Sequence, residues 1–263
     1  IERLCALPES AWSFESVFAA FDQITEALSN AWSKMDNQNN VSNSPEQRAV
    51  YNELQPKIVE FHTQIPLNPA LWKVVLGASE KLDKKTLTPT QARFVEETLS
   101  DFRDSGADLG EAQKTRIKAI ATELAALTQK FSEQALDAKN AWTLVLDDDS
   151  RLSGLPESAQ EMLLQNAIHK GLATKENPKY LINHQEPCKI AVLTYADDAD
   201  LRRTVWQASV NVARQAPYDN RPLIPKILAL RQEEAQILGK AHFPDHILPP
   251  LSPARRWPSV RCP

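Results

Sequence analysis

Apolar residues recur every three or four positions along most of the chain, which is the period of an amphipathic α-helix. The longest such stretch runs from Glu111 to Asn140. A second clear stripe runs from Phe14 to Met35, and the polar run from Asn37 to Asn43 is expected to end it. The pattern predicts helices over 14–35, 45–61, 71–82, 89–105, 111–140, 156–171, 197–216 and 222–238.

Two of these helices begin with the sequence signals of a helix N-terminus. Ser44 is a good N-cap residue, and it is followed by Pro45 at the first helical position and by Gln47 at the third. Thr88 and Pro89 repeat the first two of these signals. Local side-chain chemistry therefore predicts where both helices start.

Two short segments depart from the helical pattern and are rich in β-branched and aromatic residues. They are 142–146, with the sequence Trp-Thr-Leu-Val-Leu, and 180–183, with the sequence Tyr-Leu-Ile-Asn. Only six glycines occur in 263 residues, which favours helices because glycine costs about 1 kcal/mol in a helix interior. The predicted fold is mainly α, with a small two-stranded β element near 142–146 and 180–183.

Charge and hydropathy exclude several classes of protein. The 34 acidic and 30 basic residues give a net charge of −4, which argues against nucleic-acid or polybasic membrane binding. No stretch has the roughly 18 to 20 consecutive apolar residues that cross a bilayer, and the first residues do not resemble a secretion signal. These features predict a soluble, cytoplasmic protein.

The ends of the chain have an unusual composition. The chain begins with Ile1, which predicts that the native N-terminus lies upstream or was trimmed away. Residues 249–263 contain five prolines and three arginines without periodicity, so they predict an irregular tail of the kind that a shifted reading frame or a spliced foreign terminus produces. The expected organisation is one helical domain over 1–248 and a non-native tail over 249–263. Cys5, Cys188 and Cys262 are expected to be free thiols because they form no paired motif.

One pair of histidines has the spacing of a zinc site. His242 and His246 are four residues apart, as in the H-E-x-x-H motif of zinc peptidases. Phe243 occupies the position of the glutamate that would activate the zinc-bound water, and Pro244 lies in the same turn. We therefore interpret both histidines as ordinary residues of a helix start, and we predict no catalytic, metal-binding or cofactor-binding residue in this chain.

Other candidate motifs are weaker. The acidic run Asp147 to Asp149 lacks the spacing of a calcium loop and is expected to be a solvated turn. His62, His169 and His184 have no acidic partner nearby in the sequence, and no phosphate-binding or nucleophile-elbow motif occurs. The tryptophans are expected to pack in the core rather than to bind a ligand; they are Trp12, Trp32, Trp72, Trp142, Trp206 and Trp257.

Several stretches resemble the N-terminal region of the oligopeptidase A and thimet oligopeptidase family of zinc metallopeptidases. They are ALSNAWSKMDNQNNVSNSPEQRAVYNE at 27–53, VEETLSDFRDSGADL at 95–109, IATELAALTQKFSEQALDAKNAWTLVLDD at 120–148, AVLTYADDADLRRTVWQA at 191–208 and KILALRQEEAQILGKAHFPDHIL at 226–248. The resemblance covers about nine tenths of the chain. It implies a helical region that forms one wall of a channel, with the zinc and its H-E-x-x-H helix in a C-terminal part of the protein.

Two functions from different classes are compatible with this resemblance. The first is an N-terminal fragment of a metallo-oligopeptidase that hydrolyses short peptides, which lacks the zinc ligands and is inactive alone. Its expected partner is the missing C-terminal catalytic part. The alternative is a stand-alone helical module that binds peptides or regulates a peptidase.

Overall fold

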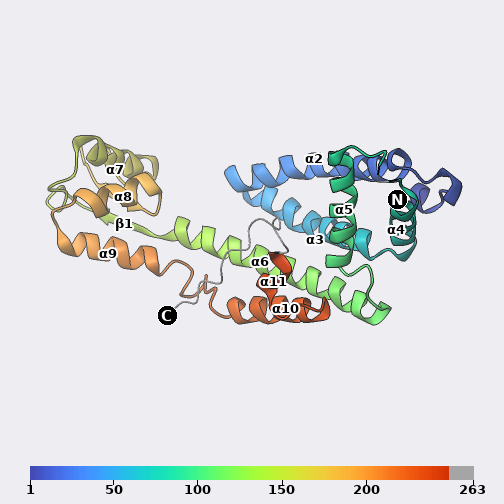
Figure 1. Cartoon of the computed structure of the whole chain (residues 1–263). Helices are drawn as coiled ribbons and strands as arrows, with labels where there is room; N and C mark the ends of the chain where they lie inside the picture. Colours follow the sequence, from blue (N-terminus) through green and yellow to red (C-terminus); the bar gives the residue numbers. More distant parts are fainter. Residues whose placement is uncertain (84, 249–263) are drawn as a thin grey trace. The chain divides into compact units, whose positions relative to one another are not determined.

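A computed structural model describes residues 1–83 and 85–248, and helices dominate this part of the chain (Figure 1). The predicted tail over 249–263 and Cys262 lie outside the described residues. The described chain divides into two compact units. The first unit consists of Ile1–Ala126 and 228–248, and the second unit is Leu127–Ile227. The assignment of 1–248 to one domain stays a prediction.

The first unit contains a series of helices joined by short turns. They are α1 Glu2–Cys5, a 3-10 turn Glu9–Ala11, a π-helical segment Phe14–Ala19, α2 Ala20–Val41, α3 Pro45–Leu67, α4 Pro69–Lys81, α5 Pro89–Asp104, the first half of α6 Glu111–Ala141, the second half of α10 Leu223–Ile237, and α11 Phe243–Ile247. The predicted caps are confirmed. The Ser44 hydroxyl accepts a hydrogen bond from the N–H of Gln47 at 3.2 Å, and Thr88 forms a reciprocal capping box with Gln91.

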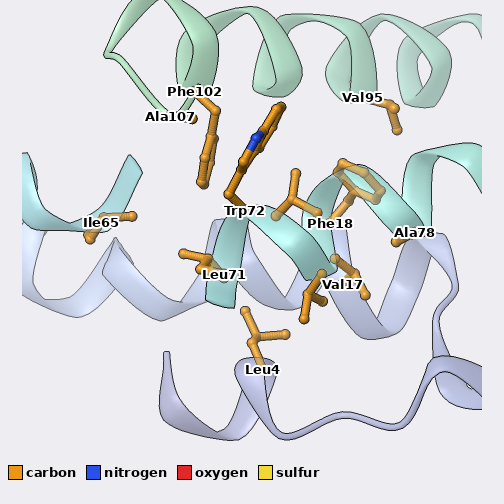
Figure 2. Close-up of a cluster of buried hydrophobic side chains, with 12 residues drawn as sticks. Leu4, Val17, Phe18, Ile65, Leu71, Trp72, Ala78, Val95, Phe102 and Ala107 are labelled. Carbon is orange, nitrogen blue, oxygen red and sulfur yellow. The ribbon is translucent and has the colours of Figure 1, made fainter. Parts of the chain in front are cut away.

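The core of the first unit is rich in aromatic side chains. Figure 2 shows Trp72 of α4 beside Phe102 of α5, with a ring-centroid distance of 5.6 Å and an interplanar angle of 18°. Phe18 is fully buried, and Trp72 also donates a hydrogen bond from its indole N–H to Asp108 at 2.8 Å. The buried residues of this cluster come mainly from α1, the π-helical segment, α3, α4 and α5, and burial of each large apolar side chain contributes about 1.5–3 kcal/mol.

The second unit is built around the predicted β element. Strand β1 is Thr143–Leu146, β2 is Tyr180–Asn183, and they pair antiparallel with Thr143 opposite Asn183 and Leu146 opposite Tyr180. The helices of this unit are the second half of α6, α7 Glu157–His169, α8 Glu186–Tyr195, α9 Ala199–Val210 and the start of α10. The mainly helical fold with one small two-stranded sheet is therefore confirmed for the described residues.

The helix that starts in the stripe 14–35 ends inside the polar run 37–43, as predicted, but its last residue is Val41 rather than Met35. Polar side chains bind one another in these last turns. Asp36 accepts hydrogen bonds from Asn40 at 3.2 Å and from the Tyr51 hydroxyl of α3 at 2.8 Å. This local network stabilises helical turns whose composition favours a loop.

Helix α3 is also longer than the prediction, which placed its end near Phe61. It continues to Leu67 and contains Pro66 in its last turn. Ile65 and Leu67 are buried there, and their burial offsets the hydrogen bond that the proline cannot donate.

The prediction of one helix over 197–216 is wrong. Helix α9 ends at Val210, and Ala213 adopts a left-handed conformation with φ of 53°. The N–H of Asn220 donates to the carbonyl of Ala213 at 2.8 Å, which closes a turn instead of extending the helix. Helix α8, Glu186–Tyr195, is a further element that the pattern did not predict, although a proline in its first turn marks its start.

None of the helices in residues 1–83 and 85–248 combines the length and the apolar composition that a membrane span requires.

Candidate functional site

The histidine pair with zinc-site spacing does not present two imidazoles on one helical face. His242 is the N-cap of α11 and has an extended backbone, with φ of −139° and ψ of 157°. Its backbone N–H donates a hydrogen bond to the carboxylate of Asp245 at 3.0 Å. Phe243 follows, and the guanidinium of Arg231 lies 5.1 Å from its ring centroid. The residues around this pair therefore do not fit a zinc site of the peptidase type.

His246 instead lines a cleft in the first unit. The cleft has a volume of about 550 Å³ and is formed by α3, α5, α6, α10 and α11. Its lining combines carboxylates, imidazoles and apolar side chains; the lining residues are His62, Thr63, Pro66, Asp101, Asp104, Ser105, Ile117, Ala121, Glu234, Leu238, His246 and Ile247. We call it the acidic cleft.

A smaller aromatic pocket adjoins the acidic cleft. Its volume is about 280 Å³, and it shares four lining residues with the cleft, namely His62, Pro66, Asp101 and Ser105. Its own walls include Phe21, Phe94 and Phe102, together with Asp22, Thr25, Ile65 and Thr98. An apolar surface thus lies next to the carboxylates of the cleft.

The carboxylates of the acidic cleft differ in how well they are neutralised. Asp104 is paired with Lys240 at 3.1 Å. Burial, followed by repulsion from Glu97 and Asp104, raises the pKa of Asp101 above its ordinary value. Burial also raises the pKa of Glu234, although the nearby His246 and Arg231 oppose this shift. Two carboxyl groups of the cleft therefore hold their protons more tightly than carboxyl groups in water.

The carboxylates of the acidic cleft are a potential binding site for a cation. Among the described residues, no group of three or more His, Cys, Asp or Glu side chains is arranged to hold a metal ion. Carboxylates can accept hydrogen bonds from an ammonium or guanidinium group. Nothing in the sequence pattern pointed to this cleft, because its residues come from five helices that are far apart in the chain.

The remaining candidate residues are as follows. The acidic run is an exposed turn, as predicted: Asp147 pairs with Lys179 at 2.7 Å, and Asp148 accepts the N–H of Ser150 at 3.0 Å.

Cys5 and Cys188 are free thiols, as expected. Burial raises the pKa of the Cys188 thiol, which makes it a poor nucleophile at neutral pH.

His184 lies in the second unit and is buried. Its ring stacks on Trp142 with a centroid distance of 4.4 Å and an angle of 20°. Its Nδ1 is buried without a hydrogen-bond partner within the described part of the chain. Burial, with help from Lys189 and Lys139, lowers the pKa of His184 below its ordinary value, so the ring is neutral at pH 7.

The prediction that tryptophans pack in the core holds for Trp72 but is wrong for Trp206, whose side chain is 54% exposed. Leu201 and Val205 form the buried face of α9. Trp206 follows Val205 directly and therefore projects from a different face of the helix. Trp257 lies outside the described residues.

Comparison with known proteins identifies relatives for almost the whole chain. Residues 4–114 match the family model of the N-terminal domain of neurolysin and thimet oligopeptidase. The chain is 32% identical over 237 residues to oligopeptidase A of Salmonella typhimurium, covering 88% of this chain and 34% of the relative. It is 31% identical over 248 residues to oligopeptidase A of Escherichia coli, covering 92% and 36%.

A plant protein shows the same relationship. The probable cytosolic oligopeptidase A of Arabidopsis thaliana is 29% identical over 245 residues, which cover 92% of this chain and 35% of the relative. The chain thus spans about a third of the length of the curated relatives that it matches. The family model covers helices of the first unit only, whereas the similarity to these relatives includes the second unit.

Proposed function

Because this chain belongs to the oligopeptidase A and thimet oligopeptidase family, as part of its N-terminal region, we propose that it is the helical part of a metallo-oligopeptidase that hydrolyses short peptides. In this proposal the chain supplies a wall of the peptide channel, and the zinc and catalytic groups come from the rest of the protein. The chain alone is then inactive. We place it in the cytoplasm, as the name of its probable cytosolic plant relative suggests.

The observation that carries the scaffold role is the arrangement of His242 and His246. His242 is the N-cap residue of α11, the imidazole of His246 lines the acidic cleft, and Phe243 stands where a zinc peptidase needs a glutamate. The two histidines thus have other roles in the fold. This supports the proposal that the catalytic residues of the family protein lie outside this chain.

Exposed apolar side chains on the second unit support a missing partner. Ile190 and Tyr195 of α8 are each 52% exposed, and Trp206 and Val210 of α9 are 54% and 46% exposed. Trp206 and Val210 are four residues apart, so they share one face of α9. Exposed apolar surface of this kind is typical of a protein interface. We propose that the C-terminal catalytic part covers it.

A hydrolysis assay tests this proposal. The chain is incubated with a fluorogenic short peptide and Zn²⁺, alone and after co-purification with the part of Escherichia coli oligopeptidase A that the match does not cover. We expect no zinc-dependent hydrolysis by the chain alone and measurable hydrolysis by the complex. Zinc-dependent hydrolysis by the chain alone, lost in a His242→Ala/His246→Ala variant, would overturn the proposal.

The second candidate function is a stand-alone module that binds peptides or regulates a peptidase. The acidic cleft favours it, because a cleft of about 550 Å³ whose Asp101 side chain has no ion-pair partner among the described residues can hold a small cationic ligand without a catalytic partner. Sedimentation velocity separates the two functions. A fragment with an uncovered interface self-associates, and Trp206→Gln/Val210→Gln reduces this association, whereas Val41→Gln, at an exposed position of the first unit, leaves it unchanged.

A further inference from the structure

We propose that the acidic cleft, together with the adjoining aromatic pocket, binds a primary ammonium group carried next to an apolar side chain. A short peptide offers this chemistry at its amino terminus when its first residue is apolar, or at a lysine next to an apolar residue. The inference rests on the proposed function, since it names a feature of the peptides that the family protein binds.

The size and lining of the two cavities match such a ligand. Pockets of about 300–1,000 Å³ that combine apolar walls with a few polar groups are typical of small-molecule sites. The acidic cleft is within this range, at about 550 Å³, and the aromatic pocket adds about 280 Å³. Phe21, Phe94 and Phe102 provide apolar surface directly beside Asp101, which lines both cavities.

One carboxylate of the cleft has no counter-ion within the described chain. Asp104 is paired with Lys240, and Glu234 has His246 and Arg231 nearby, whereas the side chain of Asp101 has no hydrogen-bond or ion-pair partner within 1–83 and 85–248. Its nearest electrostatic neighbours are Glu97 and Asp104, which repel it. Glu234 adds a further carboxyl group that burial makes harder to ionise. A partly buried carboxylate without a counter-ion is costly, and a bound ammonium group would supply both the positive charge and hydrogen-bond donors.

Other ligand classes fit less well. An anion would meet Asp101, Asp104 and Glu234 and be repelled by them. A transition-metal ion needs three or four convergent ligands, and the described residues contain no such group. His246 also lines the cleft, and its buried Nδ1 has no hydrogen-bond partner in the described chain. The side chain of a cleft residue thus has a polar atom that the rest of the described fold does not bind.

Isothermal titration calorimetry of the full chain at pH 7 tests the proposal with three probes. They are the tripeptide amide Phe-Ala-Ala, its N-acetylated form, and the N-acetylated tripeptide amide Phe-Lys-Ala. We expect the free-amine peptide to bind at least about tenfold more tightly than its acetylated form, because a hydrogen bond to a charged group contributes about 1.5–3 kcal/mol. Comparison with the lysine peptide then identifies which source of the ammonium group the cleft prefers.

Substitutions assign the binding to the cleft. Asp101→Asn and Glu234→Gln should each weaken binding of the free-amine peptide about fivefold or more, because each removes one carboxylate from the site. Glu123→Gln is the matched control, since it removes the same charge from an exposed position of α6 outside the cleft. Circular dichroism shows whether each variant folds. If one of the two cleft variants folds poorly, the other still tests the proposal.

The pH dependence gives a second readout. A cation binds the deprotonated carboxyl groups, so affinity should rise between pH 5 and pH 7, and binding should release protons, which titrations in buffers of different ionisation enthalpy measure. Equal affinity for the free-amine and both acetylated peptides, or equal weakening by Asp101→Asn and Glu123→Gln, would overturn the proposal. Because this experiment measures binding and not hydrolysis, its failure leaves the hydrolysis assay and the proposed function unaffected.

Discussion

The two units of the chain use different side chains for their cores. In the first unit, aromatic rings stack on one another, as Phe102 does with Trp72 and with Phe21. In the second unit, the core is mostly aliphatic, with fully buried Leu163, Leu201 and other residues around the small sheet. The acidic cleft and the aromatic pocket both belong to the first unit.

Both units contain short ion pairs, but one partly buried carboxylate of the first unit has no such partner in the described chain. In the second unit, Arg151 pairs with Asp198 at 2.6 Å and Lys179 pairs with Asp147 at 2.7 Å. In the first unit, Asp101 has no such partner among the described residues. The first unit therefore contains a partly buried carboxylate that lacks a counter-ion among the described residues and lies beside a cavity. The following substitutions test this contrast, from the largest expected effect to the smallest.

Truncation of the core is expected to have the largest effect. Trp72→Ala should lower the free energy of unfolding of the first unit by about 3–5 kcal/mol, because it removes a stacked ring and the hydrogen bond to Asp108. Leu163→Ala should cost the second unit about 2–5 kcal/mol. Hydrogen exchange read separately on each unit measures both. If either variant destabilises both units equally, the two units unfold together and are not independently stable.

Two glycines of the second unit provide a matched pair. Gly154 has φ of 85°, and a Cβ there would clash with the carbonyl oxygen of Tyr195. Gly154→Ala should therefore cost about 2–3 kcal/mol, because backbone strain and a rigid clash add together. Gly171 has φ of 69° and open space around it, so Gly171→Ala should cost only about 1 kcal/mol. Thermal denaturation measures the difference, and equal costs would show that the turn at Gly154 relaxes easily.

Features governed by neighbouring residues could be predicted from the sequence. The Ser44 cap is a contact between residues three positions apart, and the strand Tyr180–Asn183 is bounded by polar residues. The ends of helices were harder, because they depend on distant packing. Helix α3 extends to Leu67 since Ile65 and Leu67 are buried by side chains from elsewhere in the first unit. No local pattern contains that information.

The acidic cleft could not be predicted for the same reason. His62 and His246 line it together, although 184 positions separate them in the sequence (246 − 62). Sequence spacing drew attention to His242 and His246 as a pair, but in the fold only His246 faces the cleft. Asp101 and Asp104 are one turn apart on α5 and share a face, but two acidic residues at this spacing are common on exposed helices and gave no signal of a cleft.

The stability of the second unit should depend on pH through His184. Burial and the nearby Lys189 and Lys139 lower its pKa, while Glu186, which pairs with Lys189 at 2.7 Å, is the acidic group of this region. The unfolded chain then binds the proton more tightly than the folded chain. Stability is complete above about pH 6.5 and falls below it, by at most about 1.4 kcal/mol per pH unit.

Denaturant unfolding between pH 7.5 and pH 5 measures this effect. In a His184→Phe variant, which keeps a ring against Trp142 and cannot titrate, the slope should disappear. His169→Gln is the control, because His169 is an exposed residue of the same unit. A slope that persists in His184→Phe, or that vanishes in His169→Gln, would assign the pH dependence to another group.

The smallest expected effect is a gain of stability in the first unit. The pKa of Asp101 is raised by burial and by Glu97 and Asp104, so its ionised form at pH 7 works against folding, and this cost disappears as the pH falls through its raised pKa. Asp101→Asn should therefore stabilise the chain by about 0.5 kcal/mol at pH 7 and by nothing near pH 3. Asp104→Asn, which breaks the 3.1 Å pair with Lys240, should not stabilise it. Denaturant unfolding measures both changes in stability. Opposite signs for the two variants would show that the first unit tolerates a destabilising charge at the wall of its cleft, which is typical of a binding site.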